Sequence, residues 1–143
     1  MSTLKNVKAF LTISRAKIQL GTPPHPLLGL ILGASAFTDM ISTPALLYLA
    51  LYLLLITFAC NINCLYDIDI DKKYKKYMSD AVNTLGKKTV KSMITIEAVA
   101  IIIITSYLFT NGYIITSILA LSGMIFGYIY SAEPIRVKKR GFL

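Results

Sequence analysis

The chain has 143 residues, of which 55% are hydrophobic, and its mean hydropathy is +0.64. This composition is too apolar for an ordinary soluble domain, so it indicates a protein embedded in a membrane. The net charge of +8 does not require nucleic acid, because membrane insertion and contact with anionic lipid account for the lysines. We therefore expect membrane lipid as a partner and no nucleic acid.

Four blocks with few or no charges predict four membrane-spanning helices, since about 20 apolar residues are needed to cross the hydrocarbon core. The predicted spans cover residues 18–38, 43–66, 92–110 and 112–131, with a loop over residues 67–91. The predicted fold class is therefore an all-α membrane protein, formed as a single transmembrane domain over residues 1–143.

The first predicted span is irregular, because Pro23, Pro24 and Pro26 interrupt it within a short stretch. Proline lacks a backbone donor and clashes with the preceding turn, so a break or kink is predicted here. The backbone groups that such a break releases need other partners, which indicates a cavity near the membrane face. We expect this span to be a retained anchor and not a cleaved signal peptide.

The distribution of charge predicts the orientation of the spans. Of the 15 basic residues, four precede the first span, seven lie in the loop over residues 67–91, and four follow the last span. The short connections on the other side carry none. By the positive-inside rule, both termini and the loop are predicted to be cytoplasmic, in a multi-pass protein of the cell membrane.

Polar residues that could carry chemistry gather at the cytoplasmic end of the second predicted span, in the sequence NINCLYDIDID of Asn61–Asp71. Asn63, Asp67 and Asp71 are four residues apart and would share one helix face, whereas Asp69 points elsewhere. Such a row suits Mg²⁺, which takes oxygen ligands and leaves positions open for phosphate. The alternative is a charged helix end that only offsets nearby lysines.

The spacing of Asn63, Asp67 and Asp71 resembles the first aspartate-rich motif of the UbiA superfamily of membrane prenyltransferases. The segment MSDAVNTLG, Met78–Gly86, is similar to a loop of its archaeal-type members. The segment YSAEPIRVKKRG, Tyr130–Gly141, is similar to the family's tyrosine, proline and basic segment after the fourth span. The resemblance covers nearly the whole chain, which would form the N-terminal half of a UbiA-type helical bundle.

The resemblance implies a lipid-biosynthetic enzyme that moves a prenyl group from a polyprenyl diphosphate to an acceptor. It implies that Asp67 and Asp71 hold Mg²⁺ and that Asn63 assists them, the three forming the catalytic group. Positive side chains would neutralise the diphosphate as charge grows on it. The residues implied to bind this substrate are Arg15, Tyr130, Lys138 and Arg140. For the three basic residues, the alternative is a role in membrane orientation alone.

The chain departs from the family's pattern in two ways. The loop after the acidic motif lacks the family's Arg-Pro pair, and the family's second aspartate-rich motif, on its sixth span, has no counterpart. One expectation is a partner, either a second half-chain or a second copy in a homodimer. The alternative is a catalytically incomplete relative that binds prenyl diphosphate or a partner membrane protein.

Overall fold

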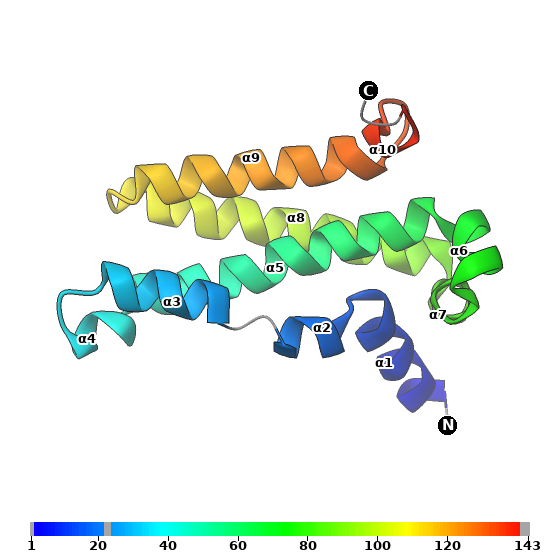
Figure 1. Ribbon diagram of the computed structural model, residues 1–143, viewed down its shortest axis with the longest axis horizontal. Coiled ribbons are helices and arrows are strands. Elements are labelled where there is room, and N and C mark those ends of the chain that lie inside the picture. The colour runs from blue at the N-terminus through cyan, green and yellow to red at the C-terminus, as the bar shows by residue number, and fades with distance from the viewer. Residues whose placement is uncertain (1, 22–23, 141–143) are drawn as a thin grey trace.

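The computed structural model of the protein describes residues 2–21 and 24–140, without the side chains at positions 2, 20, 24 and 140. All regular structure within these residues is helical (Figure 1). The helices are α1 (Ser2–Ile13), α2 (Ala16–Gly21), α3 (Pro24–Gly33), α4 (Phe37–Met40), α5 (Thr43–Tyr66), α6 (Ile68–Tyr74), α7 (Lys76–Leu85), α8 (Lys87–Thr110), α9 (Ile114–Ser131) and α10 (Val137–Arg140).

Three helices, α5, α8 and α9, are long and apolar enough to cross a membrane. They lie side by side with alternating direction and form the body of the molecule (Figure 1). Buried apolar side chains from all three pack between them, among them Leu51, Phe58, Ile101 and Ala120. Their outer faces carry large exposed apolar side chains such as Ile103, which lipid can cover.

The first predicted span, residues 18–38, is not one continuous helix in the structure, in line with the predicted break. Its described residues form parts of three short helices, α2, α3 and α4, and none of these has the length of a span. The break falls at the predicted proline cluster, of which Pro23 lies outside the described residues. Helix α3 begins at Pro24, a position where the missing proline donor costs no helical hydrogen bond.

Helices α2 and α3 nevertheless follow α5 in the opposite direction. The Gln19 amide donates to Thr57 Oγ1 at 3.0 Å. Further along, the space beside Gly29 is bounded by the Tyr48 hydroxyl, 3.4 Å from where a Cβ would lie. Later residues of the segment therefore lie beside earlier residues of α5, so the two run antiparallel. The broken segment passes along α5 towards α4 (Figure 1).

The predicted loop over residues 67–91 is mostly helical. It contains α6 and α7, and α8 begins at Lys87, five residues before the predicted span. Helix α7 packs against α1, and buried side chains of both, such as Ile13 and Val82, meet Cys64 of α5 and Val90 of α8. Helices α1, α6, α7 and α10 therefore gather at one end of the long helices (Figure 1).

Candidate functional site

The acidic row lies where α5 meets α6. Asp67 ends α5 with a φ of −101°, but the helical hydrogen bonds continue across this change of direction. The Asp67 amide donates to the Asn63 carbonyl at 2.9 Å, and the Asp71 amide donates to the Asp67 carbonyl at 2.7 Å. Successive members of the row therefore remain one turn apart. Asp67 and Asp71 are half-buried, whereas Asp69 is exposed.

Two cations from the segment that follows α9 hold the Asp67 carboxylate. Arg136 Nη2 lies 2.7 Å from Oδ1, and Lys138 Nζ lies 2.7 Å from Oδ2. Lys138 also donates to Asn63 Oδ1, which accepts a second hydrogen bond from Ser131 Oγ at 3.1 Å. The ends of α5 and α9 are thus joined by a charged cluster, and it includes the predicted residues Asn63, Asp67 and Lys138.

Arg136 was not among the residues predicted for the site. Its side chain is almost fully buried, and besides Asp67 it donates to the Tyr66 carbonyl at 2.8 Å and to Glu133 Oε1 at 3.0 Å. These contacts hold its backbone at a φ of 39°, a region that non-glycine residues rarely adopt. Glu133 also accepts from Lys139 at 3.0 Å, and these two hydrogen bonds lower the pKa of its carboxyl.

Arg15, predicted to bind diphosphate, lies in the turn between α1 and α2 with a φ of 52°. Its Nε is buried and has no hydrogen-bond partner among the described residues. Burial raises the pKa of the Asp71 carboxyl, and the negative charge of Asp67 raises it further. The positive charges of Lys75, Arg15 and Lys138 oppose this rise. The positive charge of Arg15 therefore acts on the same row.

An apolar groove of about 520 Å³ runs beside the row, between α5 and α9. Part of the groove is lined by the polar residues Asn63 and Ser131, whereas Phe126, Gly127 and Ile129 make much of the remaining lining apolar. The predicted residue Tyr130 also lines this groove. A charged cluster next to an apolar groove is a site shape suited to a molecule with a polar head and a hydrocarbon tail.

The remaining predicted residue, Arg140, belongs to α10, but its side chain lies outside the described part of the structure. No three His, Cys, Asp or Glu side chains that the structure describes are close enough together to hold a metal ion. A metal at this row would therefore combine Asp67, Asp71 and the Asn63 amide oxygen with oxygen atoms of a ligand or of water.

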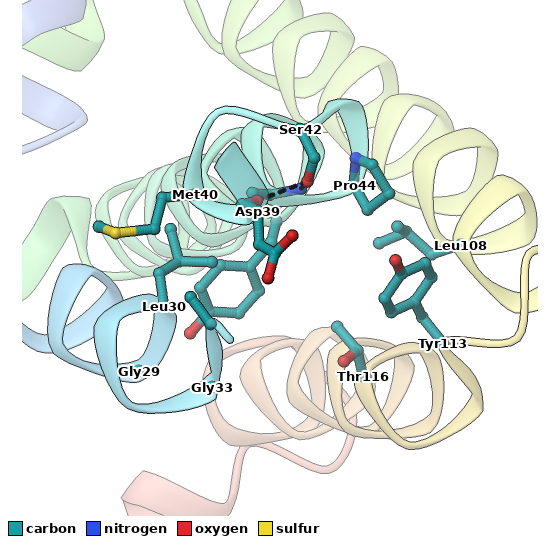
Figure 2. A pocket seen from close by; sticks show the side chains of 13 residues that line it. Gly29, Leu30, Gly33, Asp39, Met40, Ser42, Pro44, Leu108, Tyr113 and Thr116 are labelled. Carbon is teal, nitrogen blue, oxygen red and sulfur yellow. Dashed lines mark hydrogen bonds between the residues drawn. The ribbon is translucent and has the colours of Figure 1, made fainter. Parts of the chain in front are cut away.

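A second cavity, of about 590 Å³, lies at the opposite end of α5, near its first residues (Figure 2). Helix α5 has 24 residues, which places this cavity roughly 35 Å from the acidic row. Figure 2 shows Asp39, Tyr113 and Thr116 around it. Asp39 Oδ2 already accepts from the backbone amides of Ser35 and Ala36, and no basic residue that the structure describes lines the cavity. It is therefore poorly suited to an anionic group.

A buried polar contact between α5 and α8 was also not predicted. Asn61 is fully buried, and its Nδ2 donates to Glu97 Oε1 at 2.8 Å. Ser14 Oγ approaches Asn61 Oδ1 at 3.5 Å, while Glu97 Oε2 is buried without a partner among the described residues. The available signal was the presence of an amide and an acid inside two predicted spans, where polar side chains normally face each other.

Comparison with known proteins gives one informative match. The chain is 33% identical over 130 residues to a probable homogentisate phytyltransferase 2, chloroplastic, of Oryza sativa subsp. japonica. The match covers 81% of this chain but 33% of the relative, so the chain spans about a third of that protein's length. No protein-family model matches the chain, and no solved structure matches it. The matched protein is named for the transfer of a phytyl group, which is a prenyl group.

Proposed function

We propose that this chain is a UbiA-type membrane protein that binds a polyprenyl diphosphate with Mg²⁺ and contributes the donor site for prenyl transfer. Similarity to a phytyltransferase and the three motifs in the family's order support the family and the class of reaction. We further propose that the site faces the cytoplasm in the cell membrane. The basic residues that flank the long helices at that end support this orientation.

The observation that carries the proposal is the position of the charged cluster beside the apolar groove. Lys138 contacts Asn63 and Asp67, and Asn63 itself lines the groove. A diphosphate near Lys138 and Arg136 would therefore have an apolar surface next to it for the first isoprene units. Such a juxtaposition serves an amphipathic donor better than a free phosphate or a fully apolar lipid.

The side chains of the row fit Mg²⁺ in their chemistry. Asn63, Asp67 and Asp71 offer amide and carboxylate oxygens, which this ion prefers. The Lys138 ammonium between Asn63 Oδ1 and Asp67 Oδ2 shows that a positive charge is stable at that position. When bound, Mg²⁺ would offset negative charge that develops on the leaving diphosphate.

The chain's own side chains would position the donor and stabilise the leaving group. Lys138 can donate charge-assisted hydrogen bonds to phosphate oxygens, Arg136 adds a positive charge beside it, and the positive charge of Arg15 also acts on the row. Such donors act most strongly on the charge that grows as the carbon–oxygen bond breaks. Tyr130 and the groove would hold the prenyl chain so that its reacting carbon stays beside them.

Transfer itself is proposed to require a partner, either a second half-chain or a second copy of this chain. The row supplies two carboxylates, and a second acidic row would supply further metal ligands and complete the wall around the acceptor. A two-fold pair is the commonest way for identical chains to associate. Binding of the donor without transfer in any combination would favour the alternative, a protein that binds prenyl diphosphate but does not transfer it.

The test is the binding of geranylgeranyl diphosphate to the purified full chain in detergent micelles, with and without Mg²⁺. We expect binding to need the metal, and Asp67→Ala or Asp71→Ala to weaken it by about tenfold or more, as loss of a charged contact would. Asp69→Ala is the matched control, because Asp69 is an exposed carboxylate on the same helix as Asp71. Equal losses in all three variants would contradict the proposal.

A second test distinguishes the contribution of the groove to donor binding from that of the charged side chains. Gly127 lines the groove, and its nearest neighbour, the Ala59 Cβ, lies 3.6 Å from where a Gly127 Cβ would stand. Gly123, one turn earlier, faces open space. We expect Gly127→Leu to weaken binding of the long-chain donor, with little effect on inorganic diphosphate, and Gly123→Leu to change neither. Equal binding by both variants would exclude this groove as the site of the prenyl chain.

A further inference from the structure

Each carboxylate oxygen of Asp67 contacts a cationic side chain of this same protein. Arg136 takes Oδ1 and Lys138 takes Oδ2, each at 2.7 Å. Lys138 also donates to Asn63 Oδ1, so its ammonium bridges two of the oxygens that the row offers. A metal ion bound by Asn63 and Asp67 together would need the place that this ammonium occupies.

The two cations differ in how firmly they are held. Arg136 is anchored by three acceptors, Asp67, Glu133 and the Tyr66 carbonyl, and its side chain is 8% exposed. Among the described residues, Lys138 donates to side-chain oxygens of the row, and its own side chain is 13% exposed. A lysine ammonium is a compact charge on a flexible four-carbon stem, so it can change partners without moving the backbone.

We infer that Lys138 is an exchangeable cation that occupies the metal position between Asn63 and Asp67 until a diphosphate arrives. This inference rests on the proposed function and extends it to the order of events at the row. Asn63 and Asp67 would hold the metal when a metal–diphosphate complex binds, and the Lys138 ammonium would move to a phosphate oxygen. No covalent bond changes, since one set of ionic contacts replaces another.

The balance of charge around the row supports this exchange. The carboxylates of Asp67 and Asp71 are opposed by four cations, Lys75, Arg15, Arg136 and Lys138. Free metal ions therefore meet a row whose negative charge is already offset, and they must compete with Lys138 at close range. A diphosphate brings the negative charge that the displaced ammonium then pairs with. Metal and diphosphate should consequently each raise the affinity for the other, as linkage requires.

The exchange is tested with Mn²⁺ as the probe for Mg²⁺, by following the free Mn²⁺ signal in electron paramagnetic resonance without any prenyl diphosphate. We expect wild type to bind Mn²⁺ weakly, and Lys138→Met to bind it about tenfold more tightly, because one competing charged contact is gone. The same variant should bind geranylgeranyl diphosphate in Mg²⁺ about tenfold more weakly, because that contact is also lost to the donor. Opposite signs in the two measurements are the signature of exchange.

Lys139→Met is the matched control, since Lys139 is the neighbouring lysine but pairs with Glu133 and not with the row. It should leave both affinities within about twofold of wild type, which is a small free-energy change. Lys138→Gln serves as a second variant if Lys138→Met lowers the helical signal in circular dichroism. The inference is overturned if neither Lys138 variant gains Mn²⁺ affinity, or if Lys139→Met gains as much. Failure of wild type to bind the prenyl diphosphate would instead contradict the proposed function, while a gain in Mn²⁺ affinity would still identify Lys138 as the competing cation.

Discussion

The hydrogen bond between Asn61 and Glu97 predicts a measurable coupling between α5 and α8. The two side chains are 36 residues apart and meet at 2.8 Å in a buried place between two apolar helices. Interhelical hydrogen bonds in membrane proteins contribute about 0.6 kcal/mol on average and up to about 1.7 kcal/mol. The hydrogen bond is short and both side chains are buried, so we expect a coupling of about 1 kcal/mol, above that average.

The single substitutions should each cost more than the coupling itself. Asn61→Leu leaves both Glu97 oxygens without a partner among the described residues, because Oε2 has none already. Leaving a buried polar group unsatisfied costs about 1–3 kcal/mol, so each of Asn61→Leu and Glu97→Leu is expected to lose roughly 2 kcal/mol. The double variant should lose about 1 kcal/mol less than the sum, since neither member of the Asn61–Glu97 pair is then left without the other.

Unfolding of the full chain in mixed micelles, followed by circular dichroism as the fraction of denaturing detergent is raised, measures these differences. Glu97→Gln is the control, because it keeps the Oε1 acceptor that faces Asn61. It should stay within about 0.5 kcal/mol of wild type. Strict additivity of the two leucine variants, within about 0.3–0.5 kcal/mol, would refute the coupling.

Two further outcomes follow from the ends of α5 and α9. A membrane-permeant maleimide should label Cys60, which is half-buried and lines the groove, faster than Cys64, which is 2% exposed; prenyl diphosphate with Mg²⁺ should slow labelling of Cys60. Faster reaction at Cys64, or no protection of Cys60, would contradict the assignment of the groove. Lys139 and Arg136 lower the pKa of Glu133, so its stabilising effect should be present above the ordinary value of 4.5 and be lost as pH falls through the lower, folded value. Thermal denaturation below about pH 4.5 should therefore depend less on pH in Glu133→Gln than in wild type, and parallel profiles would argue against this contribution.

The bounds predicted for the second span, residues 43–66, coincide with those of α5, because the character of the sequence changes abruptly at both ends. Ser42 caps α5, with its Oγ accepting from the Ala45 amide, and Pro44 lies in the first turn. At the other end, Asp67 ends the apolar run and the helix together. The third span was predicted to begin at residue 92, whereas α8 begins at Lys87. Lysines in the first turns of α8 lower its hydropathy, although they are compatible with a helix.

Helices α1 and α7 were missed because both are short and polar on one side. Each carries buried apolar residues four apart, Ala9 with Ile13 and Met78 with Val82, which is the helical period. A search for membrane spans does not detect such short amphipathic patterns. They pack against each other and against the end of α5, so they form a cap at the end where the site lies.

The grouping of Asn63, Asp67 and Asp71 could be predicted from the sequence because they lie four residues apart, in consecutive turns where α5 meets α6. The cations that contact this row depend on tertiary structure. Arg136 is 69 residues away from Asp67, and nothing in local spacing distinguishes it from the other basic residues near the end of α9. Burial does distinguish it, since Arg136 is enclosed and Lys139 is exposed. Long-range pairing of this kind becomes visible only when the ends of α5 and α9 are placed together.

If the groove holds the prenyl chain as proposed, its position implies that the charged cluster, and not contact with the prenyl chain, would determine which ligand is selected. The groove lies between helices whose outer faces are apolar and would be surrounded by lipid. Moving a hydrocarbon tail from lipid into such a groove replaces one apolar environment by another, so the hydrophobic effect contributes little. Contacts with the diphosphate have no such equivalent in the bilayer. Under the proposed function, Lys138 and a metal held by Asn63 and Asp67 would supply them at one end of the groove. The long apolar helices would then position the donor, while the few polar residues at their ends would determine which molecule is held.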